Sequence, residues 1–374
     1  MKYIFILPRM GGGGAERVVS ILANSLAVDK NNDVSVFTIV GGESFYPLRK
    51  EICYESVGAS ISKKNVFART ISKAVFFPKA LIHIYRKLKQ GKYDIVISML
   101  PETDILVGLC KCLGLKFNHV CSERNDPTKR SKFQFATLNA IYKKAALFVC
   151  QGKKAYDFYV KVPQEIKCII PNPVDGASLP VRPEIYSKRI VSVGRLNPQK
   201  NFSLLIRSFA RISNLFPDYN LDIYGEGPER AMLEALISDM GVDGRVNLRG
   251  AVKNVKECIA DAELFVMSSN HEGFPNALLE AMAIGLPVIS TDFPTGIAAE
   301  LISHENGIVV PLEDETALAN AMQILLSNDQ IRWKMGAINR KKSEKYYSDN
   351  ILSQWKEQFL LVAQKTQCKT KGAQ

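Results

Sequence analysis

The chain has 374 residues, 47% of them hydrophobic and 23% charged, which excludes a disordered or fibrous protein and allows about two domains. No apolar run approaches the roughly 20 residues of a membrane-spanning helix, and eight cysteines without a CxxC pair indicate reduced thiols in a cytoplasmic protein. The net charge of +12 is uneven, because residues 1–180 hold 27 basic and 14 acidic side chains, against 22 and 23 in the remainder. This asymmetry predicts an acidic partner for the N-terminal half.

Short β-branched runs alternate with stretches of helical periodicity along the whole chain. The apolar runs are continuous rather than alternating, so they predict strands buried on both faces, as in parallel sheets covered by helices. The predicted strands are 3–7, 34–40, 94–98, 119–122, 147–150, 167–170, 189–194, 220–224, 246–249, 264–268, 287–290 and 307–310. The pattern predicts an α/β protein with two Rossmann-like, doubly wound domains and a ligand cleft between them.

Prolines mark the boundary between the two halves. Pro171, Pro173, Pro180 and Pro183 punctuate the connection before a new strand begins at Arg189. We predict an N-terminal domain over residues 1–178, a C-terminal domain over 179–347, a terminal helix over 348–364 and a flexible tail over 365–374.

A basic stretch over residues 56–93 holds nine Lys and Arg side chains and no carboxylate, with apolar residues interleaved. It fits a solvated helix face, a nucleic-acid groove or a surface for anionic lipid head groups. We favour the lipid surface, since the aromatic side chains suit a membrane interface and no nucleic-acid-binding motif is present.

Four glycines, 11–14, follow the first strand and precede a helix. They allow close approach of the backbone to an anion at the helix start, although a plain tight turn remains an alternative. A dinucleotide fingerprint is excluded because Glu16 and Arg17 stand where its last glycine would be.

A second glycine loop opens the C-terminal half. Arg195 follows the strand 189–194, and Lys200 stands five residues later at a helix start. A guanidinium fork beside an ammonium group suits a diphosphate; the alternative is a pair of solvated loop cations.

The segment 270–283 carries two glutamates at the next strand-to-helix connection. Glu272 lies in the loop, Asn276 or its neighbour caps the helix, and Glu280 follows one turn later among apolar residues. Because an unpaired buried carboxylate is costly, Glu280 is expected to face a polar group, and Gly273 lets a phosphate approach the helix start. The alternative is an ordinary capped helix.

These motifs together resemble glycosyltransferase family 4, whose members are retaining enzymes of the two-domain GT-B fold and include bacterial capsule, O-antigen and lipid-linked oligosaccharide glycosyltransferases. The resemblance rests on the E-x7-E spacing of Glu272 and Glu280 and on GGGGAE, VGRLNPQKN, YGEGPE and ENGIVV, which occur in the family's order. It extends from the first strand to about Tyr347.

The resemblance implies that the C-terminal domain binds a nucleotide-sugar donor. Arg195 and Lys200 would hold the donor diphosphate, Glu280 the ribose, and Glu272 the hydroxyls of the sugar; Glu272, Arg195 and Lys200 form the implied catalytic set. The remaining donor contacts would be Gly13, Gly14, Gly273, Phe274, Pro275, Asn276 and, in the nucleobase loop, Val252. No D-x-D triplet occurs, which fits an enzyme that needs neither a metal nor another cofactor.

The implied acceptor site lies in the N-terminal domain, with Glu16, Glu123 and Arg124 as candidate residues. Many relatives have a histidine where Arg124 stands, so proton transfer through an imidazole is not expected here. Either Glu123 or Asp126 substitutes for it, or Arg124 holds an acceptor phosphate. The terminal helix 348–364 would cross back to this domain.

The sequence therefore predicts a retaining transferase that moves a hexose or N-acetylhexosamine from a UDP-sugar to a saccharide acceptor in bacterial surface polysaccharide synthesis. We expect an undecaprenyl-diphosphate-linked acceptor, peripheral attachment to the inner face of the cell membrane and no nucleic-acid partner. The alternatives are a nucleotide-sugar epimerase of the same architecture and a non-catalytic, basic membrane-binding protein.

Overall fold

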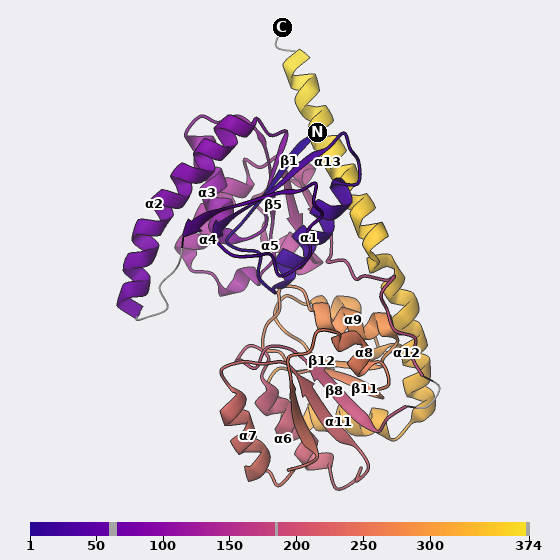
Figure 1. The fold of residues 1–374 in the computed structure, drawn as a ribbon. Coiled ribbons are helices and arrows are strands. Elements are labelled where there is room, and N and C mark those ends of the chain that lie inside the picture. Colours follow the sequence, from indigo (N-terminus) through magenta and orange to yellow (C-terminus); the bar gives the residue numbers. More distant parts are fainter. Residues whose placement is uncertain (60–65, 184–185, 372–374) are drawn as a thin grey trace. The chain divides into compact units, whose positions relative to one another are not determined.

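The computed structural model describes residues 1–59, 66–183 and 186–371, without the side chains of 59, 66–76 and 366–371. The chain forms two compact units: Met1–Asn172 together with Asp349–Gln374, and Pro173–Ser348. Each unit contains one parallel sheet covered by helices on both faces (Figure 1). The predicted α/β class with two doubly wound domains is therefore confirmed.

The sheet of unit 1 has seven strands in the order β3-β2-β1-β4-β5-β6-β7, all parallel. The strands are β1 (Lys2–Leu7), β2 (Asp33–Val40), β3 (Cys53–Ala59), β4 (Ile95–Ser98), β5 (Asn118–Ser122), β6 (Leu147–Cys150) and β7 (Lys167–Ile169). The sequence analysis missed β3. It is an edge strand with exposed polar residues such as Glu55 and Ser56, so it lacks the continuous apolar run that marks the central strands.

Helices cover both faces of this sheet. They are α1 (Gly14–Leu26), α2 (Val66–Gly91), α3 (Pro101–Cys112), α4 (Lys132–Tyr142), α5 (Lys153–Phe158) and α13 (Ser348–Lys371), with short 3-10 turns η1 (Pro127–Lys129) and η2 (Gln164–Ile166). One face packs against α1 and α13 and the other against α2 and α3 (Figure 1). This doubly covered arrangement explains why the central strands are buried throughout.

Unit 2 contains a six-stranded parallel sheet in the order β10-β9-β8-β11-β12-β13. Its strands are β8 (Arg189–Val193), β9 (Asn220–Tyr224), β10 (Val246–Gly250), β11 (Leu264–Met267), β12 (Val288–Thr291) and β13 (Gly307–Val310). Its helices are α6 (Phe202–Ile212), α7 (Arg230–Asp239), α8 (Val255–Ile259), α9 (Asn276–Ile284), α10 (Ile297–Leu301), α11 (Glu315–Leu326) and α12 (Asp329–Ser343), followed by η3 (Glu344–Tyr346). Two apolar clusters, one on each face of the sheet, form its core.

The C-terminal helix α13 belongs to unit 1 although it follows unit 2 in the sequence. Ile351, Trp355, Phe359 and Val362 recur at helical spacing and are buried in the core of unit 1. The helix continues to Lys371, beyond the predicted end at residue 364, and only residues 372–374 of the predicted tail lie outside the described residues.

Within the described residues, no helix is both long enough and apolar enough to cross a bilayer. The seven cysteines whose side chains are described form no disulfide with one another.

Candidate active site

The loop after β8 places Arg195 and Lys200 at the carboxyl end of the sheet in unit 2. A Cβ atom on Gly194 would lie 2.9 Å from Lys200 Cε, so the side chain of Lys200 crosses directly over this glycine. Asn201 ends the loop in the left-handed conformation (φ 46°) and caps α6 by accepting a hydrogen bond from Leu204 N. Arg195 is exposed and forms no hydrogen bond or ion pair with any described residue, so its guanidinium is available to a ligand.

Glu272 lies in the loop between β11 and α9, and its carboxylate contacts the first loop directly. Lys200 Nζ donates to Glu272 Oε1 at 2.6 Å, and Ser269 Oγ donates to the same oxygen at 2.7 Å. Gln199 Nε2 lies 3.4 Å from Glu272 Oε2 and donates to His271 O at 2.9 Å. Since only 7% of Glu272 is exposed, the pair with Lys200 is shielded from solvent. The two loops therefore form one connected site.

Sequence reasoning assigned Lys200 to a diphosphate and Glu272 to a sugar, and it did not anticipate that the two side chains pair with each other. It also missed Ser269 and Gln199, which orient the carboxylate. The only sequence signal for them is position, because Ser269 precedes Glu272 by three residues and Gln199 immediately precedes Lys200.

Glu280 lies in the second turn of α9, and 8% of the residue is exposed. Its neighbours in the helix, Leu279 and Ala281, belong to the core. A carboxylate in such an apolar helix requires polar surroundings, as the sequence predicted. Phe274, which precedes the helix, is also buried, whereas Val252 after β10 is 39% exposed.

The two glycines of the YGEGPE motif are required because the backbone packs closely against them. A Cβ atom on Gly225 (φ +149°) would lie 1.8 Å from Gly194 O, and one on Gly227 would lie 2.1 Å from Leu196 O. Leu196 N donates to Glu226 O at 3.0 Å. These contacts fix the backbone of the loop that carries Arg195 and Lys200.

The glycine run of unit 1 ends at Gly13, the N-cap of α1. A Cβ atom on Gly13 would lie 2.3 Å from Glu16 Oε2, so the carboxylate of Glu16 folds back over the start of its own helix. Glu16 is the third residue of the helix, the position from which a capping-box glutamate reaches the N-cap. The anionic group at this helix start is therefore the protein's own carboxylate, which disfavours a phosphate there.

Glu123 and Arg124 follow β5 and have different surroundings. The Glu123 carboxylate is 2% exposed, and it accepts hydrogen bonds from both terminal nitrogens of Arg130 and from Tyr159 Oη. Arg124 is 7% exposed and donates from Nη1 to Asn172 Oδ1. Burial lowers the pKa of Arg124, because its charge is removed from water.

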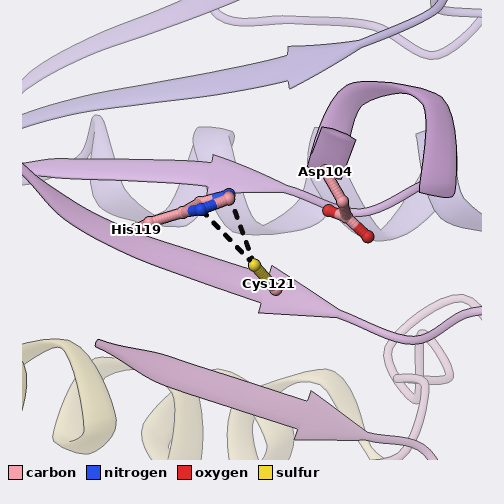
Figure 2. Close-up of side chains that lie close together, drawn as sticks. All are labelled: Asp104, His119 and Cys121. Carbon is pink, nitrogen blue, oxygen red and sulfur yellow. Dashed lines mark hydrogen bonds between the residues drawn. The ribbon is translucent and has the colours of Figure 1, made fainter. Parts of the chain in front are cut away.

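Asp104, His119 and Cys121 form a buried cluster in unit 1, with one potential metal-ligand atom of each within 4.8 Å of the others (Figure 2). Ser98 Oγ donates to Asp104 Oδ1 at 2.6 Å and lies 2.7 Å from His119 Nε2, and Tyr142 Oη donates to Asp104 Oδ2 at 2.8 Å. Burial raises the pKa of Asp104 well above its usual range and lowers that of His119 to about 3. The cluster is thus a neutral, internally hydrogen-bonded part of the core.

Comparison with known proteins assigns both halves of the chain. The model of Glycosyltransferase Family 4 matches residues 12–177, and that of Glycosyl transferases group 1 matches residues 184–342. The chain is 26% identical over 359 residues to the GalNAc-α-(1→4)-GalNAc-α-(1→3)-diNAcBac-PP-undecaprenol α-1,4-N-acetyl-D-galactosaminyltransferase of Campylobacter jejuni, covering 95% of this chain and 97% of that protein.

Solved structures share the fold. Sucrose-phosphate synthase from Thermosynechococcus elongatus superposes with a TM-score of 0.81 at 18% identity, covering 96% of this chain and 98% of that one. Anabaena HepE in complex with UDP gives a TM-score of 0.77 at 17% identity, covering 96% and 99%. The chain has the GT-B fold and belongs to the glycosyltransferases, with a family 4 domain followed by a group 1 domain.

Proposed function

We propose that the chain is a retaining glycosyltransferase that transfers a hexose or N-acetylhexosamine from a UDP-sugar to a saccharide acceptor in bacterial surface polysaccharide synthesis. The observation that carries this proposal is the site in unit 2, where exposed Arg195 stands beside the shielded pair of Lys200 and Glu272. Both loops follow the carboxyl ends of neighbouring parallel strands, β8 and β11, which is where open α/β sheets bind ligands.

The charges of this site suit a leaving diphosphate. As the bond between the anomeric carbon and the diphosphate oxygen breaks, negative charge develops on that oxygen, and Arg195 and Lys200 stabilise it. The acceptor hydroxyl attacks from the same face and gives its proton to the departing phosphate, so the products are a glycoside and UDP. Glu272 orients the sugar hydroxyls and Glu280 accepts from the ribose, because carboxylates are pure acceptors.

The remaining donor contacts follow from the same placement. The loop of Gly273, Phe274, Pro275 and Asn276 lets the sugar and phosphate approach the start of α9, and the exposed Val252 contacts the nucleobase. No metal or other cofactor takes part in this proposal. Gly13 and Gly14 would let the backbone approach the donor closely, and the carboxylate of Glu16 lies over the same helix start.

A lipid-linked acceptor and a peripheral position at the inner membrane face complete the proposal. The Campylobacter relative acts, by its name, on an undecaprenol-diphosphate-linked saccharide. In the present chain, α2 and the residue that ends α3 form an apolar hollow of about 440 Å³ that also contains two cations; it is lined by Leu81, Ile82, Tyr85, Arg86, Lys89 and Leu113. Exposed apolar groups beside exposed cations suit an anionic bilayer surface. The part of the basic stretch over residues 60–76 lies outside the described side chains.

A thermal-shift screen of nucleotide sugars tests the donor assignment. A UDP-sugar at about 100 times its Kd should stabilise unit 2 by roughly 2.7 kcal/mol through mass action. The response should be lost in Lys200→Gln and Arg195→Ala. If no UDP-sugar shifts unfolding, or if product forms from the donor without any acceptor, as for an epimerase, the proposal is wrong.

Vesicle co-sedimentation tests the membrane assignment. The full chain should sediment with phosphatidylglycerol vesicles at low salt and be released by high salt, since each basic residue contributes about 1 kcal/mol. The Arg86→Glu/Lys89→Glu variant should bind less, whereas the Lys334→Glu/Lys341→Glu variant, with the same charge change in unit 2, should bind as the wild type does. Equal loss in both variants would leave α2 without a specific role.

A further inference from the structure

Arg124 is a buried guanidinium whose hydrogen bonds are incomplete. Its Nε and Nη2 atoms have no partner among the described residues, and no carboxylate of the described residues forms an ion pair with it. Arg182 shows the contrast, because its three side-chain nitrogens donate to three backbone carbonyls. Each unpaired buried donor costs about 1–3 kcal/mol, and an uncompensated buried cation costs more.

The structure nevertheless holds Arg124 firmly in one place. Asn172 Oδ1 accepts hydrogen bonds from both Arg124 Nη1 and Gln151 Nε2. The three residues follow β5, β6 and β7, which are neighbours in the parallel sheet, so they gather at its carboxyl edge. This edge is the usual ligand-binding side of such a sheet.

Trp355 of α13 lies next to Arg124 and carries another unsatisfied donor. The Arg124 guanidinium lies 5.7 Å from the centre of the Trp355 ring, and the buried indole Nε1 has no hydrogen-bond partner among the described residues. Asp126, two residues further along the chain, caps η1 through Oδ1, which accepts from Thr128 N and Oγ1, while its buried Oδ2 has no hydrogen-bond partner among the described residues. Three donor nitrogens therefore lack an acceptor among the described residues, and the guanidinium has no carboxylate in direct contact.

Glu123 offsets the charge of Arg124 only at a distance, because its carboxylate pairs with Arg130, so a neutral occupant such as water would satisfy the hydrogen bonds but leave the guanidinium without a direct counterion. A carboxylate or phosphate supplies both, because its oxygens accept several hydrogen bonds and carry negative charge. We infer that Arg124 and the indole N–H of Trp355 form an oxyanion subsite, and that the accepting saccharide carries a carboxylate or a phosphate group which binds there. This inference rests on the proposed glycosyltransferase function and names the chemical class of its acceptor.

Tryptophan fluorescence offers a direct test, because the chain has only two tryptophans and Trp333 is exposed. In a full-length Trp333→Phe protein, all tryptophan emission comes from Trp355. The probes are methyl α-D-glucuronide for a carboxylate, glucose 1-phosphate for a phosphate and methyl α-D-glucoside as the neutral control. We expect a saturable change with one or both anionic probes and at least about tenfold weaker binding of the neutral one.

Variants separate binding from folding. Arg124→Gln should weaken the anionic probes about tenfold or more, and Arg124→Lys, which keeps the charge without the fork, should weaken them less. Lys200→Gln should leave probe binding unchanged while abolishing the UDP response, so failure of this inference is distinguishable from failure of the donor assignment. The inference is overturned if neither anion binds, if the neutral glycoside binds equally well, or if both Arg124 variants bind the anions as the wild type does.

Discussion

A double-mutant cycle with Lys200→Met and Glu272→Gln measures the coupling free energy of the ion pair that joins the two loops of unit 2. The Nζ–Oε1 distance is 2.6 Å, and only 17% and 8% of the two side chains are exposed. At an effective dielectric constant of about 20, the gross attraction at this distance is roughly 6 kcal/mol, most of which offsets the desolvation of both charges.

The two single variants should differ in their effect on stability. Lys200→Met leaves a buried carboxylate with only Ser269 and Gln199 as donors, and we expect a loss of about 3 kcal/mol. Glu272→Gln keeps the shape and an acceptor oxygen, so it should cost about 1–2 kcal/mol. The double variant should lose less than the two together, with a coupling free energy of about 2 kcal/mol.

Hydrogen exchange of peptides from β8 and β11 gives the opening free energy of unit 2 separately from unit 1. The matched control is the pair of Arg211 and Glu315, also in unit 2, with a distance of 3.1 Å but side chains 52% and 32% exposed. Its coupling should be about 0.2–1 kcal/mol. A coupling for Lys200 and Glu272 no larger than that of the control would refute the reasoning that burial strengthens the pair.

Three further predictions concern single residues. Arg195→Ala should leave unfolding unchanged within about 0.5 kcal/mol, because the side chain has no described partner, yet weaken UDP binding about tenfold in calorimetry. Gly225→Ala should destabilise unit 2 by more than about 3 kcal/mol in urea unfolding, since its Cβ would overlap a backbone oxygen, whereas Gly241→Ala, with φ +64° and open space, should cost only about 1 kcal/mol. The pKa of His119 is about 3 in the folded protein, below the value of about 6.5 in the unfolded chain. Neutral His119 therefore contributes to folding stability fully above pH 6.5, and this contribution is lost as the pH falls. The stability advantage of the wild type over His119→Asn should shrink by roughly 3 kcal/mol between pH 6.5 and 4. Asp104 has a raised pKa and acts in the opposite direction, but it is common to both proteins; an advantage independent of pH would contradict the assignment of His119 as neutral.

The sequence predicts the position of some residues of the candidate site but not all of their contacts. Arg195, Lys200 and Glu272 stand beside the ends of apolar strands and within glycine-containing motifs, so their position at the carboxyl edge of a sheet could be predicted. The pairing of Lys200 with Glu272 could not, since the partners are far apart in the chain and either could have faced solvent. The role of Glu16 could not be predicted either, because a glutamate at this position can cap its own helix or contact the acceptor substrate.

By itself, the sequence determined the α/β class, the two-domain organisation and the central strands, because continuous apolar runs can be buried only between layers of helices. Tertiary structure decided the rest. The edge strand β3 has no such run and is defined by its pairing with β2, and α13 joins unit 1 through a stripe whose partners lie at the other end of the chain. The charge balance of Arg124 likewise depends on which distant side chains pack around it. Its neighbours come from the segments after β5, β6 and β7 and from α13, and local sequence patterns do not predict contacts between segments so far apart in the chain.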